Sequence, residues 1–262
     1  MPFPAVGGQP APPDERAVSR VAQWNESTRE ELRALTDDAL LVIPTGTTEQ
    51  HGPHLATGTD ALLVEEVAKR AAAAATRPTV ILLAPTLAYG ASDHHLPFGG
   101  TLSLGVETFE AVLRDLLRSA AVCGCRRIFV LNGHGGNAAS CGVVVAEASR
   151  DLGIVAATAL YSQLVDPAAL GHEVAGHAGI FETALMLAVH PRLAQMEAAR
   201  PSPGGGARVR ARGLVASEPA RWRELDGFTD RPNEATVELG EQALAAVVAA
   251  TAAAFDEVAG LG

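Results

Sequence analysis

Short apolar runs alternate with longer segments of helical periodicity along most of this chain. The first run, ALLVIP at 39–44, ends in Gly and Thr, and the following segment at 60–75 repeats its apolar side chains at helical spacing. An alternation of this kind predicts buried parallel strands that are joined by crossover helices. The sequence therefore predicts an α/β fold, a three-layer α/β/α sandwich with a mostly parallel central sheet.

The rest of the chain continues this pattern. Further strands are expected at 79–87, 127–131 and 154–160, and further helices at 106–123, 138–152, 181–189 and 234–259. Gly153 is expected to end a helix, and Gly240 is expected to break the last one. Thr59 or Asp60 is expected to cap the helix at 60–75, and Asn137 the helix at 138–152.

Length and composition fit one large domain that follows a flexible arm. The chain has 262 residues, of which 48% are hydrophobic, which is enough for a full globular core. Residues 1–20 are rich in proline and lack the continuous apolar core of a signal peptide. We therefore expect a flexible arm at 1–20, a single domain at 21–262, and a loop or mobile flap at 201–213.

Charge and cysteine content restrict the class of partner and the compartment. The net charge of −10 should repel nucleic acid and anionic membranes. No apolar run approaches the roughly 18 to 20 residues of a membrane helix. Cys123, Cys125 and Cys141 are odd in number, and the first two are too close for an ordinary disulfide, so we expect a reduced cytoplasmic protein. A thiolate metal site is the alternative, although the usual CxxC pairs are absent.

Three glycine-rich motifs follow the predicted strands. TGTTEQHG follows the first strand, LAYGASDHH the second and NGHGGN the third. Ligands of parallel sheets bind beyond the carboxyl ends of the strands, so these motifs should meet at one edge. A fourth segment, HAGIFET at 177–183, lies at the start of the helix predicted at 181–189.

Acidic and imidazole side chains in these motifs predict a site for divalent metal ions. Glu49 and His51 are two residues apart, so an extended segment would direct both to the same side. Asp60 could bridge two cations through its two oxygens, and glycines leave room for a metal beside His134. Oxygen ligands mixed with imidazole suit Zn, Mn, Fe(II) or Co.

These residues also have simpler interpretations. Glu49 and Asp60 could be surface and capping acids, and His51 a loop histidine. NGHGGN could be a phosphate-binding turn, although no Lys, Ser or Thr stands where a P-loop would have it. His177 could be a general acid or base, or a hydrogen-bonded loop histidine. Glu182 could be an exposed acid in the first turn of its helix.

The predicted metal site suits hydrolysis of a C–N bond. Two cations that share a carboxylate lower the pKa of a bridging water and polarise a carbonyl. No GxSxG element and no cysteine with an evident partner supplies a side-chain nucleophile. We therefore expect a metal-dependent amidohydrolase in which a metal-bridging hydroxide attacks a carbonyl, while His177 passes a proton to the leaving nitrogen.

Together the motifs resemble those of the creatininase (creatinine amidohydrolase) family. GTTEQHGPHLATGTD, YGASDHHLPFGGTLSL, NGHGGN, HAGIFET and GFTDRPNEATVELGEQ carry this resemblance, which extends from about Leu41 to Glu241. The resemblance implies a creatininase-like fold, a small-molecule substrate, and a homo-oligomer, often a hexamer. It also implies two divalent ions per chain, with zinc as the first expectation and Mn, Fe(II) or Co as alternatives. The metal ligands that it implies are Glu49, His51, bridging Asp60 and His134, and it assigns substrate and proton handling to His177.

The chain departs from creatininase itself at two places. Gly136 stands where creatininase has a further metal-binding glutamate, so Glu182 is the candidate for both the fifth ligand and a catalytic role. The stretch SQLVDPAALGHEVAG lacks the pocket tryptophans of creatininase, and the only tryptophans of the chain are Trp24 and Trp222. These departures predict an amide, cyclic amide or formamide substrate other than creatinine.

Two alternatives to a small-molecule amidohydrolase stay open. The NGHGGN form resembles other branches of the family, which include a pyrimidine deformylase of flavin and deazaflavin biosynthesis and a peptidase of the mycofactocin pathway. A metallopeptidase that trims a short or modified peptide is therefore one alternative, and a non-catalytic ligand-binding relative is the other. The candidates for substrate binding are Ser92, Asp93, His95 and Gly136. His94 could also line the pocket, and both His94 and His95 could equally be solvated loop residues.

Overall fold

Five parallel strands form the central sheet of the protein. The computed structural model describes residues 21–166, 176–204, 218 and 220–262, so the predicted arm at 1–20 and most of the predicted flap lie outside the described residues. The strand order is β1-β3-β2-β4-β5, and every neighbouring pair is parallel. The strands are β1 (Val21–Gln23), β2 (Leu40–Thr45), β3 (Ile81–Leu83), β4 (Arg127–Asn132) and β5 (Val155–Leu160).

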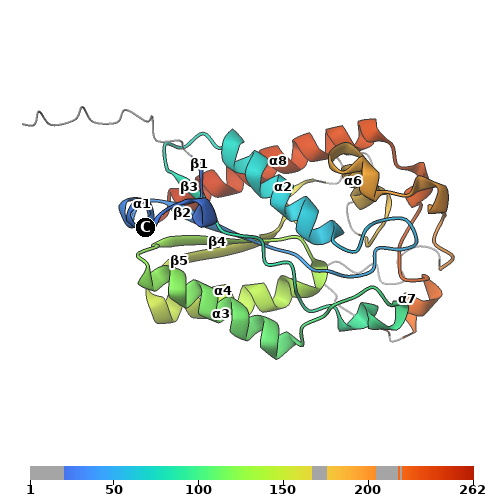
Figure 1. The fold of residues 1–262 in the computed structure, drawn as a ribbon, viewed down its shortest axis with the longest axis horizontal. Coiled ribbons are helices and arrows are strands. Elements are labelled where there is room, and N and C mark those ends of the chain that lie inside the picture. The colour runs from blue at the N-terminus through green and yellow to red at the C-terminus, as the bar shows by residue number, and fades with distance from the viewer. Residues whose placement is uncertain (1–20, 167–175, 205–217, 219) are drawn as a thin grey trace, which may run out of the picture.

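Helices cover both faces of this sheet, which confirms the predicted three-layer sandwich (Figure 1). One face carries α2 (Thr59–Ala74), α6 (Ile180–Val189) and α8 (Val237–Ala259), and the other carries α3 (Val106–Val122) and α4 (Ala138–Leu152). Side chains alternate along a strand, so Leu40 and Val42 enter one core while Leu41 and Ile43 enter the other. This burial on both faces explains why β2 is a continuous apolar run.

Three short elements have no counterpart in the sequence-based prediction. These are β1, α1 (Arg29–Leu35) and α7 (Arg221–Glu224). The predicted strand at 79–87 is also too long, because its ladder ends at Leu83 and Pro85 follows without a backbone N–H. By contrast, Gly153 ends α4 with a left-handed backbone (φ 64°), as the sequence indicated.

Gly240 does not break the last helix, so that prediction is wrong. Helix α8 runs through it without interruption, and a Cβ at this position would lie 1.9 Å from the carbonyl oxygen of Ala184 in α6. The glycine therefore permits the close contact between α6 and α8. Among the described residues, α8 alone has the length and hydropathy of a membrane-crossing helix. Its apolar side chains, such as Val247 and Phe255, fill the core against the sheet.

The predicted helix caps do not form capping hydrogen bonds, although Asn137 has the predicted position. Gly58 occupies the N-cap of α2, and neither Thr59 nor Asp60 caps that helix. Asn137 occupies the N-cap of α4 without a capping hydrogen bond, and its Oδ1 instead accepts from the backbone N–H of Ala91, at 2.9 Å. The polar side chains near these helix starts are thus directed toward the loops that follow β2 and β3.

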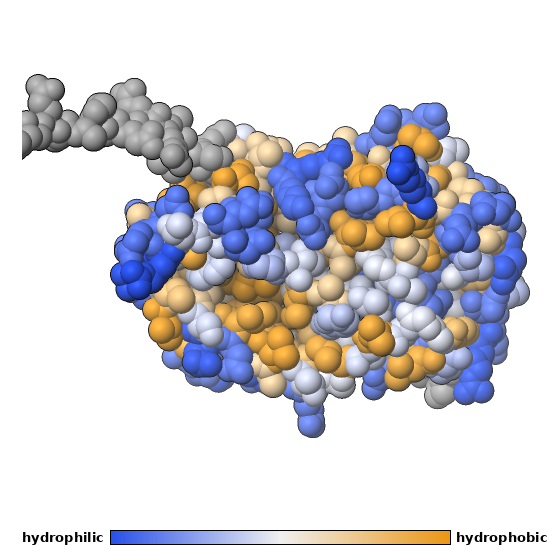
Figure 2. Space-filling model, in the orientation of Figure 1, coloured by the Kyte–Doolittle hydropathy of each residue, from blue (hydrophilic) through white to orange (hydrophobic). Residues whose placement is uncertain are grey.

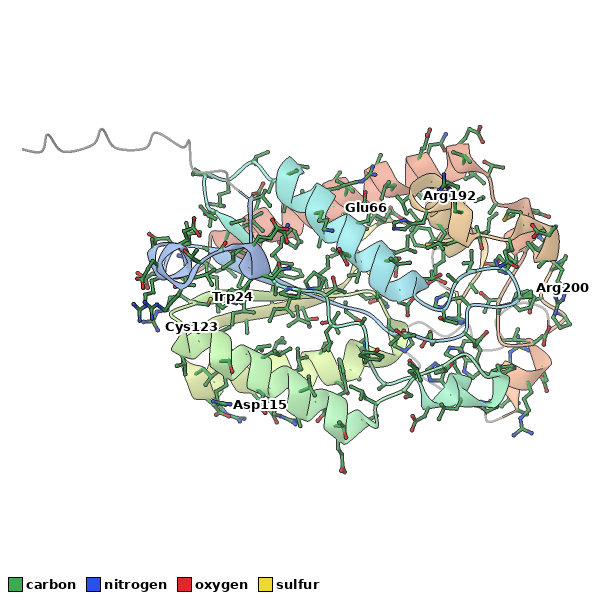
Figure 3. All side chains as sticks on the ribbon, in the orientation of Figure 1. Trp24, Glu66, Asp115, Cys123, Arg192 and Arg200 are labelled. Carbon is green, nitrogen blue, oxygen red and sulfur yellow. The ribbon has the colours of Figure 1, made fainter. Side chains whose placement is uncertain are left out.

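An apolar groove of about 350 Å³ opens on the α3 side of the sheet (Figure 2). Trp24 and Cys123 lie near each other at this groove (Figure 3), and Leu87 and Leu116 also line it. All three cysteines are free. The groove contains none of the acidic or imidazole side chains that the motifs contribute.

Candidate metal centre

The glycine-rich motifs meet at the carboxyl end of the sheet. Glu49 and His51 follow β2, Asp60 lies in the first turn of α2, and His134 follows β4. His177 precedes α6, and Glu182 lies in its first turn. The first four of these residues and His177 are buried, while 14% of the Glu182 side chain is exposed. The structure therefore brings together all six residues that the sequence suggested.

Asp60 lies between two groups of potential ligands. Its Oδ1 is 3.1 Å from His51 Nε2, and its Oδ2 is 3.0 Å from His134 Nδ1. Glu49 Oε1 is 3.2 Å from the same nitrogen of His134, and Glu182 Oε2 is 3.8 Å from His51 Nε2. Three sets of ligand atoms are compact enough for one ion each: Glu49–Asp60–His134, His51–Asp60–Glu182 and Glu49–His51–His177. Asp60 belongs to the first two sets, as a bridging carboxylate would.

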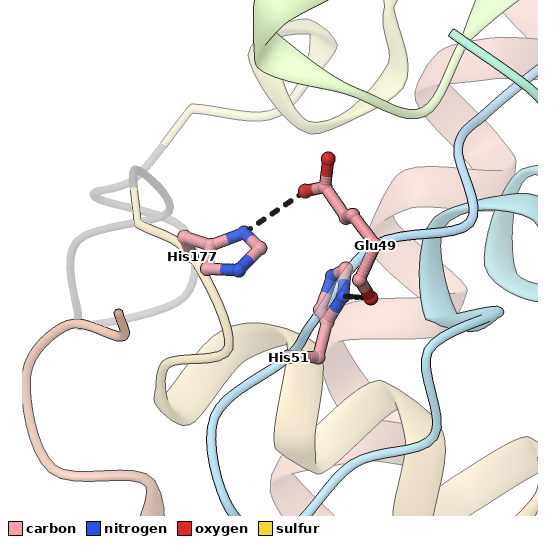
Figure 4. A group of neighbouring side chains, drawn as sticks. All are labelled: Glu49, His51 and His177. Atoms are coloured by element: carbon pink, nitrogen blue, oxygen red, sulfur yellow. Dashed lines mark hydrogen bonds and ion pairs between the residues drawn. The ribbon is translucent and has the colours of Figure 1, made fainter. Parts of the chain in front are cut away.

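Three histidines are oriented by backbone carbonyls. The pairs are His51 Nδ1 with Glu49 O at 3.1 Å, His134 Nε2 with Ala91 O at 3.2 Å, and His177 Nε2 with Gln50 O at 2.8 Å. A carbonyl oxygen only accepts, so the paired nitrogen carries the hydrogen and the other nitrogen of the neutral ring faces the cluster. Figure 4 shows His51 and His177 beside Glu49. Histidines that bind metals are held in this way.

One buried carboxylate oxygen indicates that a cation belongs here. Within the described part of the chain, Glu49 Oε1 has no hydrogen-bond donor. It lies 3.2 Å from His134 Nδ1, 3.3 Å from His177 Nδ1 and 3.5 Å from His95 Nε2. An uncompensated buried charge costs several kcal/mol. The donor set of carboxylate oxygens and unprotonated imidazole nitrogens therefore fits a divalent metal ion.

Protons balance the buried carboxylates when no cation does. Burial opposes the charged form of His51, but nearby Asp60 overrides it and raises the pKa of His51 to about 9. Burial likewise opposes protonation of His134, but the neighbouring carboxylates of Asp60 and Glu49 raise its pKa to about 10. Burial tends to raise the pKa of Asp60, yet His51 and His134 hold it well below its usual value. Burial raises the pKa of Glu182 to about 7.

Metal binding should therefore release protons. Because the ligands must be deprotonated, titrating metal-free protein with Zn²⁺ near pH 7.5 should release about two protons per chain, from His51 and His134. The release should decline as the pH rises through the pKa values of about 9 and 10, where the free imidazoles have already lost their protons. A pH indicator in weakly buffered solution measures it, and release that is independent of pH would contradict this picture.

The predicted substrate-binding residues have different surroundings. Ser92 is buried and its hydroxyl donates to Glu49 Oε2, while His95 is 1% exposed and faces Glu49 Oε1. Asp93 is exposed, and its carboxylate accepts from Ser103 Oγ at 2.6 Å. A role of Asp93 in substrate binding stays a prediction.

Gly136 and His94 also lie beside His134 in the cluster. A Cβ at Gly136 would lie 2.4 Å from His134 Nε2, so the glycine leaves room for this histidine. His94 is half-buried, and its ring stacks with that of His134 at a centroid distance of 5.8 Å.

Trp222 and Gln50 reach the cluster without having been predicted there. Trp222 comes from α7, and its ring centroid is 4.6 Å from that of His95, 5.5 Å from His94 and 5.6 Å from His177. The site thus has a tryptophan after all, although it does not come from the stretch before His177, part of which lies outside the described residues. Gln50 adjoins both motif residues Glu49 and His51, and that adjacency was the one signal for it.

Comparisons with known proteins identify the family to which the chain belongs. The creatininase family model, described as creatinine amidohydrolase, matches residues 25–255. The chain is 36% identical over 182 residues to the mycofactocin precursor peptide peptidase of Mycobacterium tuberculosis, which covers 67% of this chain and 68% of that protein. It is 32% identical over 197 residues to the creatinine amidohydrolase of Pseudomonas putida, covering 66% of this chain and 72% of that protein.

Solved structures give the same result. A crystal structure of creatinine amidohydrolase (creatininase) superposes with a TM-score of 0.78 at 29% identity, over 92% of this chain and 99% of that chain. A manganese creatininase superposes with a TM-score of 0.77, also at 29% identity, over 90% and 98%. With a family model that matches most of its length and a shared fold, the chain belongs to the creatininase family of hydrolases.

Proposed function

We propose that this protein is a dinuclear metal-dependent amidohydrolase that cleaves a C–N bond in a small amide, cyclic amide or formamide. The observation that carries the proposal is the unpaired, buried Glu49 Oε1 beside Asp60, whose two oxygens face separate ligand groups. The proposed metal ligands are Glu49, His51, Asp60, His134 and Glu182. Zinc is our first choice, with Mn, Fe(II) or Co as alternatives, and similar solved creatininases include a manganese form and a Zn–Zn form.

The chain's own residues would divide the work. When bound, the two ions would activate water and polarise the substrate carbonyl. His177 presents its unprotonated Nδ1 to the cluster because its Nε2 donates to the backbone oxygen of Gln50. Burial, with His51 and His95 nearby, lowers the pKa of His177 well below its usual value, so the ring is neutral and its Nδ1 carries a lone pair that can take a proton. It could then pass that proton to the leaving nitrogen.

This division of roles predicts different losses for two histidine variants. His134→Ala should lose metal and activity together, because its Nδ1 faces both Glu49 and Asp60. His177→Ala should keep its metal while kcat falls by about 10²- to 10⁴-fold, the usual contribution of a general acid or base. Elemental analysis and steady-state kinetics on the same preparations measure both. His190→Ala, outside the cluster at the end of α6, is the control. Equal loss of metal in both variants would refute the division.

A peptidase is the second candidate function. It is favoured by the identity of 36% with a mycofactocin precursor peptide peptidase. A panel of formamides, lactams, dipeptides and longer peptides, compared by kcat/KM, separates the two functions. Turnover confined to small amides supports our first choice, and turnover confined to peptides supports the second. Lack of turnover by metal-loaded protein on the whole panel would favour a non-catalytic ligand-binding protein. Assembly into a homo-oligomer stays a prediction, which light scattering can test.

A further inference from the structure

The side-chain amide of Gln50 has a fixed orientation. Its Oε1 accepts from the backbone N–H of Gly52 at 2.9 Å, and its Nε2 donates to the carbonyl oxygen of Gly227 at 2.6 Å. An N–H can only donate and a carbonyl can only accept, so the amide cannot be reversed. The second hydrogen of Nε2 faces two ring nitrogens, His95 Nδ1 at 2.7 Å and His177 Nε2 at 3.2 Å. His177 Nε2 already donates to Gln50 O, so His95 is the acceptor.

This contact sets the tautomer of His95. Because Nδ1 accepts, the hydrogen of the neutral ring must be on Nε2, which lies 3.5 Å from Glu49 Oε1. His51, His134 and His177 direct an unprotonated nitrogen toward the cluster, whereas His95 directs its N–H group there. A ring nitrogen that carries a hydrogen cannot bind a metal. His95 is therefore a hydrogen-bond donor at a site whose other ring nitrogens are acceptors.

The ring of His95 is also held in place. It stacks on His177 with centroids 4.1 Å apart and planes 23° apart, and Trp222 packs edge-on against it at 4.6 Å. The side chain is buried, at 1% exposure. A donor that is fixed in advance at a buried site stabilises developing charge more than a mobile one does.

We propose that His95 is a catalytic residue whose Nε2–H donates a hydrogen bond to the substrate carbonyl oxygen, and that Gln50 is the positioning residue that fixes this donor. The proposal rests on the proposed function, because negative charge develops on that oxygen when a nucleophile adds to the carbonyl carbon. His95 keeps its proton throughout, so its role is separate from the proton transfer assigned to His177.

The first test measures metal content and kinetics of two His95 variants. His95→Ala should retain wild-type metal content while kcat falls by about 10²- to 10³-fold, the usual cost of losing one such donor. His95→Gln, which offers an amide N–H, should recover part of the loss. Loss of metal in His95→Ala would make this residue a ligand, and a kcat within about threefold of wild type would leave it a packing role; either result overturns the proposal.

The second test does not depend on turnover. Nitrogen NMR of metal-loaded protein with ¹⁵N-histidine should show His95 as the Nε2–H tautomer. Gln50→Glu keeps the shape but offers only acceptors, so it should shift His95 toward the Nδ1–H tautomer and lower kcat more than it raises KM. An Nδ1–H tautomer in the wild type would overturn this role alone. Absence of any hydrolysis by the metal-loaded wild type would instead remove the proposed function, and this role with it.

Discussion

Replacing Asp60 by Asn should abolish binding of at least one of the two proposed metal ions and lower kcat/KM by about 10³-fold or more. Each oxygen of Asp60 faces a different imidazole, and the amide keeps only one oxygen, so one of the two groups loses its shared ligand. The loss follows from the several kcal/mol that a metal contributes to the transition state, since each 1.36 kcal/mol is about tenfold in rate. Elemental analysis and kinetics on the purified variant measure both effects.

The fold should tolerate this substitution. Asparagine has the size of aspartate, and its oxygen can still accept from Thr47 Oγ1, which donates to Asp60 Oδ2 at 2.6 Å. The matched control is Asp115→Asn on the exposed surface of α3, which should keep wild-type metal content (Figure 3). A folded Asp60→Asn protein that retains both ions would mean that Asp60 does not bridge them.

Replacing Gly136 by Glu should damage the site, although the family resemblance places a metal-binding glutamate there in creatininase. A Cβ at this position would lie 2.4 Å from His134 Nε2 and 2.8 Å from Ala91 O, the two atoms that form the hydrogen bond orienting His134. Both must shift, so metal should be lost and the free energy of unfolding should fall by about 1–3 kcal/mol, as in other overpacked interiors. Thermal unfolding and metal analysis measure these effects.

Two alanine variants separate the effect of space from that of charge. Gly136→Ala has the same Cβ and should show most of the damage. Gly135→Ala should be near wild type, because no described atom lies within 4 Å of a Cβ at this neighbouring position. Tighter metal binding in Gly136→Glu, with Gly136→Ala unchanged, would mean that the chain can accept a creatininase-like ligand set.

The sheet and the edge that carries the site could be predicted from the sequence because both depend on local patterns. The runs that became β2 and β4 are apolar on both faces, and each is followed directly by a motif with metal-binding residues. β1 has only three residues and half-buried side chains, which leave too little periodicity to recognise. The capping hydrogen bonds were predicted wrongly because an Asp or Asn side chain at a helix start can accept a hydrogen bond either from the helix or from a neighbouring loop. The sequence does not distinguish the two.

Other features depend on contacts between distant segments. Gly240 has the local signature of a helix break, but its role is set by Ala184 in another helix. Trp222 lies more than 120 residues after His95, and only the folded chain brings their rings together. The orientation of His95 likewise depends on Gln50, which is itself held by Gly227. No periodicity or motif in the sequence predicts these three features.

Glu182 is the proposed substitute for the metal-binding glutamate that creatininase has at the position of Gly136. Its Oε2 lies 3.8 Å from His51 Nε2 and accepts from the backbone N–H of Ala178 at 2.6 Å, so the carboxylate is held beside the second ligand group. The most direct test of the account is elemental analysis of purified wild type and Glu182→Gln for Zn, Mn, Fe, Co and Ni. We expect about two ions per wild-type chain and about one in the variant. Two results would contradict this expectation: metal near zero in the wild type that added divalent ions do not restore, or two ions in both proteins.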